Sequence, residues 1–109
     1  NKTINKTINK SKVGDVIFNS IDRDGNAAGL DIENVNILTK NLKKPLLIMG
    51  GAGKPEHIIN CLNFKKVSGI VTANLFNFLG DGLNKIRNQA ITNGIRMAKF
   101  DASLINLNV

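Results

Sequence analysis

Short apolar runs alternate with longer amphipathic stretches along most of this chain. The run VGDVIFNSI at 13–21 is short and rich in β-branched residues, which predicts a buried strand rather than a helix. The unbroken apolar run LLIM at 46–49 predicts a second strand with both faces buried, as in parallel sheets. A third strand is predicted for SGIVTA at 68–73.

Each predicted strand is followed by a stretch with helical spacing. Asp31 is a candidate N-cap for a helix over 32–44, because its carboxylate can accept the free amide hydrogens of a first turn. A second helix is expected at 55–66, and a third at 80–94 with Gly94 as its C-cap.

The remaining segments carry weaker patterns. Residues 1–12 are polar and repetitive, and predict either the frayed end of a preceding helix or an unstructured lead-in. Residues 74–78 predict a short turn or a helical stub. No structure is predicted for 95–109.

Three strand–helix units over residues 13–109 predict an α/β domain with parallel strands and right-handed crossovers. Their spacing, near thirty residues, suits a doubly wound sheet or a (β/α)8 barrel. Three strands cannot close a barrel, which usually needs about 250 residues. The pattern therefore predicts either a small open sheet or the last part of a barrel.

The charge and composition of the chain limit the classes of partner that it is expected to bind. The net charge is +7, but the lysines are scattered through turns and helix faces, and none of the five Phe alternates with basic residues on a strand. We therefore expect no nucleic-acid partner. No apolar stretch is long enough to span a membrane. Cys61 is the only cysteine, which fits a reducing cytoplasm, and we expect it to pack as a small apolar residue.

Candidate binding residues gather in the loops after the predicted strands, and such loops meet at one edge of a parallel sheet. GGAGKP is not a phosphate-binding P-loop, because Pro55 follows the lysine where a hydroxyl residue belongs. Gly50, Gly51 and Gly53 nevertheless allow backbone amides to approach an anion ahead of a helix N-terminus. The alternative is a tight turn that binds nothing.

Two aspartates follow the first predicted strand. Asp22 fits a turn role with Arg23 as its partner. Asp24 lies beside the candidate anion site, where a carboxylate could transfer protons on the body of a phosphorylated substrate.

We interpret His57, the only histidine, as a helix-surface or supporting residue. One His and one Cys cannot build a usual zinc site, so no metal is expected.

Three segments, VGDVIFNSIDRDGNAAGLD, PLLIMGGAGKPEH and TANLFNF, resemble in order and spacing the C-terminal part of the cyclase subunit of imidazole glycerol phosphate synthase. The resemblance runs from Val13 to Phe78, and more weakly to Phe100. It implies a (β/α)8 barrel in which the three strands are the sixth, seventh and eighth. It also implies a cyclase of histidine biosynthesis that uses ammonia from a glutaminase subunit and closes an imidazole ring on a phosphorylated ribulosyl substrate, with no cofactor.

The resemblance also assigns residue roles. Asp24 matches the second catalytic aspartate of that family, a proton-transfer residue; the first is expected on a strand outside this sequence. Asp15 falls in the charged ring at the ammonia entrance. The positions matched to phosphate or substrate binding are Gly25, Gly50, Gly51, Ala73 and Asn74.

Several positions depart from the family pattern. Met49 replaces a small hydroxyl residue, Asn74 a phosphate-site serine, and Asn26 a threonine. The segment after Phe78 also resembles paralogues from surface-polysaccharide clusters, thought to supply ammonia for converting an acetamido into an acetamidino sugar. A third hypothesis is a non-catalytic barrel that activates a glutaminase.

We also expect these 109 residues alone to be poorly stable, because an open three-stranded parallel sheet leaves its edges and one apolar face uncovered.

Overall fold

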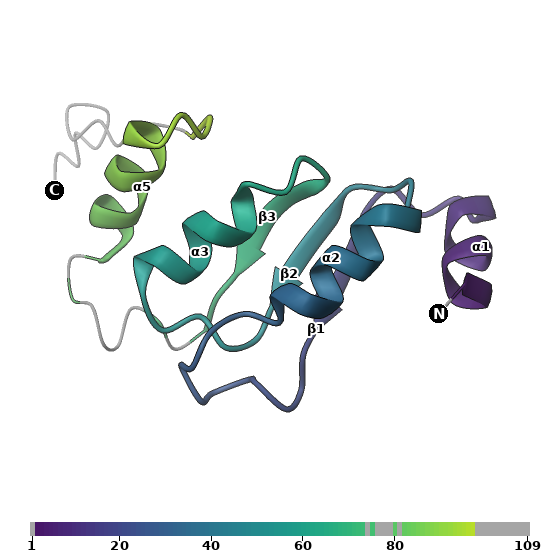
Figure 1. Ribbon diagram of the computed structural model, residues 1–109, viewed down its shortest axis with the longest axis horizontal. Coiled ribbons are helices and arrows are strands. Elements are labelled where there is room, and N and C mark those ends of the chain that lie inside the picture. Colours follow the sequence, from purple (N-terminus) through teal and green to yellow (C-terminus); the bar gives the residue numbers. More distant parts are fainter. Residues whose placement is uncertain (1, 74, 76–79, 81, 98–109) are drawn as a thin grey trace, which may run out of the picture.

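The computed structural model describes residues 2–73, 75, 80 and 82–97. Strands and helices alternate after an N-terminal helix, as the hydrophobic pattern predicts (Figure 1). The elements are α1 (Lys2–Lys10), β1 (Val16–Asn19), α2 (Ile32–Asn41), β2 (Leu46–Met49), α3 (Pro55–Leu62), β3 (Val67–Val71) and α5 (Gly82–Thr92).

The three strands form one parallel sheet in the order β1-β2-β3. Helices α2 and α3 lie on the same face of this sheet (Figure 1). Strands that follow one another in a single direction with right-handed crossovers must place their helices this way. A doubly wound sheet reverses its strand order and covers its second face only where its second half begins. The three strands are therefore consistent with part of a barrel.

The core lies between the sheet and these two helices. It is aliphatic, as expected from a chain without Trp or Tyr. On β2, Leu46 and Ile48 are 1% and 0% exposed, because they point towards α2 and α3. The other buried residues of this cluster are Leu30, Val35, Leu42, Cys61 and Val67.

The opposite face of the sheet is less covered within the described part of the chain. Ile17 is 57% exposed, while Leu47 and Met49 are only half-buried. The strand register aligns Ile17 with Leu47, and Met49 with Val71, so these side chains share that face. The expectation that β2 is buried on both faces is therefore wrong here: alternate residues are fully buried on the helix side only.

Strand β1 is shorter than the predicted 13–21. Val13 and Ile21 are 46% and 81% exposed and lie outside it. The strand is limited by its partner, because β1 pairs only with the four residues of β2. β3 begins one residue earlier and ends two residues earlier than predicted.

Helix α1 resolves the alternatives for residues 1–12 in favour of a helix over Lys2–Lys10. It also contacts the end of α2, which stops at Asn41, three residues before the predicted end, because Leu42 takes an extended conformation. The Asn9 side chain donates to the Asn41 carbonyl at 3.0 Å and accepts from the Lys43 N–H at 2.8 Å. These bonds occupy backbone groups at the end of α2.

The end of α5 confirms Gly94 as a C-cap. Gly94 has φ +79°, and its N–H donates to the Ile91 carbonyl at 3.0 Å. The Ile95 N–H donates to the Ala90 carbonyl at 2.9 Å, which completes a Schellman motif. The predicted helix 80–94 is shortened to Gly82–Thr92, and the stub predicted at 74–78 lies largely outside the described residues.

Candidate functional site

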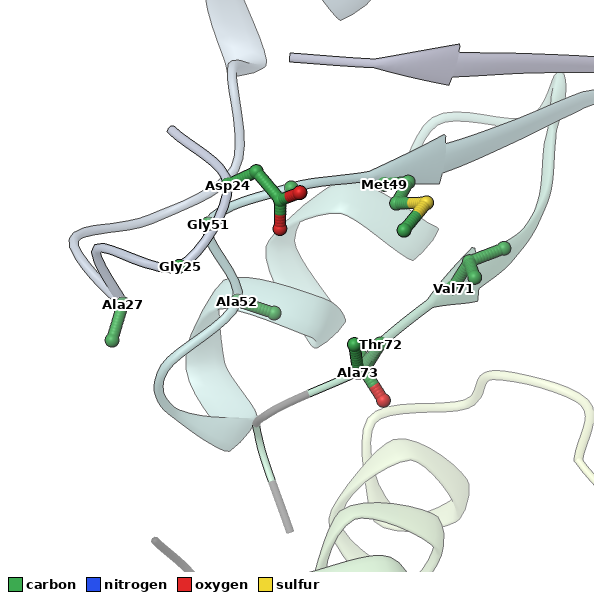
Figure 2. A pocket seen from close by; sticks show the side chains of 10 residues that line it. Asp24, Gly25, Ala27, Met49, Gly51, Ala52, Val71, Thr72 and Ala73 are labelled. Atoms are coloured by element: carbon green, nitrogen blue, oxygen red, sulfur yellow. The ribbon is translucent and has the colours of Figure 1, made fainter. Parts of the chain in front are cut away.

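The loops after β1, β2 and β3 meet around one shallow hollow of about 20 Å³ at the carboxyl edge of the sheet (Figure 2). This volume is far too small to enclose a whole phosphorylated substrate. The residues that line it are Asp24, Gly25, Ala27, Met49, Gly50, Gly51, Ala52, Val71, Thr72 and Ala73.

A tight turn after β1 places Asp24 at this hollow. The Ser20 N–H donates to the Met49 carbonyl, extending the strand pairing by one bond. The Ser20 carbonyl then accepts from the N–H of Asp24 at 3.0 Å, which turns the chain. Gly25 follows with φ +82°, a left-handed conformation that suits glycine. The exposed Asp24 carboxylate is thereby held on a defined turn next to the end of β2.

Arg23 holds the far end of the same loop. It was expected to pair with Asp22, but its guanidinium instead donates to the carbonyls of Gly29 and Leu30, at 3.3 and 3.5 Å. The two bonds tie the start of the loop to its end, immediately before α2. They restrict the loop that carries Asp24.

The paired glycines after β2 are required by close contacts between loops. Gly50 and Gly51 both have φ +99°. A Cβ on Gly50 would lie 2.6 Å from the Ser20 carbonyl oxygen, and one on Gly51 would overlap the Gly29 carbonyl oxygen. The Gly29 N–H donates to the Gly51 carbonyl at 2.8 Å. The turn therefore has a structural reason for glycine, and it leaves backbone close to the hollow.

Helix α3 begins directly after this turn, with Pro55 in its first turn and Lys54 as its N-cap. The Lys54 side chain makes no capping hydrogen bond. A helix N-terminus carries partial positive charge, which favours a nearby anion. Backbone amides and helix dipole therefore act in the same direction at this edge of the sheet.

Asp31 joins β1 to the start of α2 and confirms the predicted N-cap. Its carboxylate accepts from the Asn34 backbone N–H at 3.2 Å and from the Asn34 side chain at 2.8 Å. The Ser20 hydroxyl lies 3.4 Å away and donates to it. The side-chain bond from Asn34, with smaller contributions from its backbone N–H and the charge of Arg23, holds the pKa of Asp31 below its usual value.

Most of the residues predicted for the site are brought together. Asp24, Gly25, Gly50, Gly51 and Ala73 all line the hollow, whereas Asn74 lies outside the described residues. Asp15 is exposed just before β1, at the opposite end of the sheet.

Thr72 lines the hollow and was not singled out from the sequence. Its place directly after β3 was the available signal, because binding residues gather at the carboxyl ends of parallel strands. Met49 was noted only as a departure from the family pattern. Figure 2 shows its side chain between Asp24 and Val71.

The single cysteine and histidine lie outside the hollow. Cys61 lies on α3 and is buried in the core against the sheet, and burial raises the pKa of its thiol to about 11, so it packs as the small apolar residue expected. His57 is half-buried in the first turn of α3. Among the described residues, no three His, Cys, Asp or Glu side chains are grouped so that they could hold a metal ion. None of the described helices has the length and apolar character needed to cross a membrane.

Comparison with known proteins points to a single family. The model of the family described as histidine biosynthesis protein matches residues 2–81. The provisionally named imidazole glycerol phosphate synthase subunit hisF2 of Parasynechococcus marenigrum is 38% identical over 76 residues, which cover 70% of this chain and 28% of that protein. The imidazole glycerol phosphate synthase subunit HisF of Methanocaldococcus jannaschii is 27% identical over 92 residues, 84% of this chain and 34% of its own length.

A third relative, the imidazole glycerol phosphate synthase subunit HisF of Hydrogenobaculum, is 30% identical over 73 residues, 67% of this chain and 29% of that protein. The chain therefore spans about a third of the length of the curated relatives that it matches.

Proposed function

This chain belongs to the histidine biosynthesis protein family, and we propose that it forms the C-terminal part of an ammonia-dependent cyclase of the imidazole glycerol phosphate synthase type. The proposed whole is a (β/α)8 barrel whose sixth to eighth strands are β1, β2 and β3. Parallel strands in sequential order, with both crossover helices on one face, support this placement. The half-exposed apolar face would then point into the barrel.

The observation that carries the proposal is the position of Asp24 on the same hollow as the Gly50–Gly51 turn and Ala73. Backbone amides of the turn and the N-terminus of α3 would hold one phosphate of the substrate. Asp24 would face the part of the substrate beyond that phosphate. Closing a ring with ammonia requires protons to be removed from nitrogen and delivered to departing oxygen, and one carboxylate can do both.

The proposed complex includes a glutaminase subunit that supplies the ammonia. Asp15 lies at the end of the sheet opposite the hollow, where ammonia would enter the barrel before travelling along its axis. The second catalytic aspartate would come from the strands that complete the barrel. No cofactor is needed for this chemistry.

The test compares two aspartates of the same loop in the complete protein. Asp24→Asn keeps the shape of the side chain but removes the base, so substrate loss with an ammonium salt should slow by about 10²- to 10⁴-fold. Asp22→Asn is the matched control, since Asp22 is exposed and does not line the hollow. It should retain nearly full activity. The substrate is the doubly phosphorylated ribulosyl intermediate of histidine biosynthesis.

The same variants separate catalysis from a scaffold role. Loss of turnover in Asp24→Asn with glutaminase binding intact supports the proposal. If the wild-type protein shows no ammonia-dependent activity on any acceptor but still activates a glutaminase, the barrel is a scaffold and the catalytic proposal fails.

Met49 favours a second candidate. Its thioether lines the hollow at a position where the resembled family has a small hydroxyl residue, so one hydrogen-bond donor to a phosphate is lost. A sugar acceptor converted from the acetamido to the acetamidino form fits such a changed site. Wild-type protein that binds its glutaminase but leaves the ribulosyl substrate untouched would favour this candidate, whereas turnover would remove it.

A further inference from the structure

His57 contacts the glycine turn from outside the hollow. Its Nδ1 accepts a hydrogen bond from the Gly53 N–H at 3.1 Å. An imidazole nitrogen that accepts carries no proton, so this bond places the ring proton on Nε2. The Gly53 N–H is engaged by His57 and is therefore not available to an anion.

The same ring lies against the loop that carries Asp24. Three of its atoms, Nε2, Cδ2 and Cε1, lie 3.8–3.9 Å from the point that a Cβ on Gly29 would occupy. Gly29 is where the two loops join: its N–H donates to the Gly51 carbonyl, and its carbonyl accepts from Arg23. His57 thus accepts a hydrogen bond from the glycine turn and lies beside the Asp24 loop, without lining the hollow.

His57 also makes a reciprocal hydrogen bond at the start of α3. Lys54 makes no side-chain capping bond, so the start of the helix is not fixed in the usual way. In a capping box, a side chain at the third helical position reaches back to the backbone N–H of the N-cap. His57 occupies that third position and reaches one residue further, to Gly53.

We propose that His57 is a positioning residue, whose Nδ1 holds the 50–54 turn against Gly29 in the shape that binds a phosphate group. The inference rests on the proposed function, since it concerns the phosphate site named there. It adds a residue that touches neither the phosphate nor the reacting atoms.

The test uses a matched pair of unbranched substitutions in the complete protein. His57→Gln offers an amide oxygen that can accept from the Gly53 N–H, whereas His57→Met has similar length and no such acceptor. Binding of inorganic phosphate is measured by calorimetry, and KM and kcat are measured with the ribulosyl substrate. Loss of one such hydrogen bond should weaken phosphate binding and raise KM about fivefold in His57→Met, with kcat changed less than twofold.

His57→Gln should restore phosphate binding to within about twofold of wild type, by the same hydrogen-bond argument. Thermal melts show whether each variant folds, and phosphate binding is compared between variants that do. Equal phosphate affinity in wild type and His57→Met, a fall in kcat alone, or a Gln variant as weak as the Met variant would each overturn the inference. Wild-type protein that binds no phosphate would instead contradict the proposed function.

Discussion

The two faces of the sheet differ sharply, although the same strands build both. On the helix side, Ile48 is 0% exposed and packs in the core under α2 and α3. On the other side, Ile17 of the adjacent strand β1 is 57% exposed. Both are isoleucines in four-residue strands, so the difference comes from what covers each face and not from the residues themselves.

The apolar side chains of the less covered face support the proposal that further structure covers it in a complete barrel. Parallel sheets are normally buried on both faces. Side chains from all three strands share this face in two aligned rows, one with Ile17 and Leu47, the other with Met49 and Val71. The matched segments cover only 28% and 29% of two of these relatives, and in the proposed barrel further strands would cover this face.

The largest predicted effect separates the two faces directly. Ile48→Ala removes a fully buried side chain, so the free energy of unfolding of this chain should fall by about 2–5 kcal/mol. Ile17→Ala is the matched control, and should cost under about 1 kcal/mol because little of that side chain is buried. Urea unfolding followed by circular dichroism measures both.

In a complete protein that includes the remaining strands of the proposed barrel, the difference between these two variants should become smaller. The cost of Ile17→Ala should then rise towards that of Ile48→Ala, because the inner face becomes buried. A cost that stays small in the complete protein would argue against the barrel.

The carboxyl edge, where the two faces meet, should be the next most sensitive region. Gly51→Ala combines a left-handed φ with overlap of the Gly29 carbonyl oxygen, and should cost more than about 2 kcal/mol. Gly25→Ala shares the left-handed φ but meets no atom within 4 Å, so it should cost about 1–2 kcal/mol. The same unfolding measurement ranks them, and equal costs would show that the loop contact does not matter.

A smaller effect is expected at the start of α2, on the covered face. Asp31→Ala removes the N-cap and should cost about 1 kcal/mol at pH 7. Because the pKa of Asp31 is lowered in the folded state, its stabilisation is present above the unfolded value of about 4 and is lost as the pH falls through the folded value.

The free energy of unfolding, measured between pH 7 and pH 2, tests this predicted pH dependence. Wild type and Asp31→Ala should converge at low pH. Asp22→Ala serves as a control for the removal of a surface carboxylate. A difference that persists unchanged at pH 2 would mean that the ionised carboxylate is not the source.

The last prediction concerns the reactivity of Cys61, which lies on α3 and is buried against the covered face. With its pKa raised to about 11, little reactive thiolate forms near pH 8. A thiol reagent should therefore label the folded chain far more slowly than the urea-unfolded chain. Labelling at the same rate in both states would show that the covered face opens readily.

Local sequence signals predicted much of the fold. The Asp31 N-cap and the Gly94 C-cap were identified because each depends on a residue's own chemistry near a helix end. The end of α2 was missed because Asn9, more than thirty residues away, occupies its last backbone groups. The partner of Arg23 was missed for a related reason, since Gly29 and Leu30 become its neighbours only when the loop folds back.

The residues of the candidate site were likewise predicted only in part. Residue types and strand ends indicated Asp24 and the glycine turn, and the family resemblance added Ala73, but neither indicated Thr72 or the hydrogen bond from Gly53 to His57. The glycines at 50 and 51 were interpreted as openings for an anion. Their contacts with Ser20 and Gly29 show that loop packing also requires them.

By itself, the sequence determined the order of strands and helices, the caps and the places where the chain can turn, because these follow from residues close together along the chain. Only the tertiary structure decided which sheet face is covered, which loops touch and what His57 holds. Those depend on contacts between residues brought together by parallel pairing and crossover helices. Such contacts set burial, and burial and distance determine what each side chain can do.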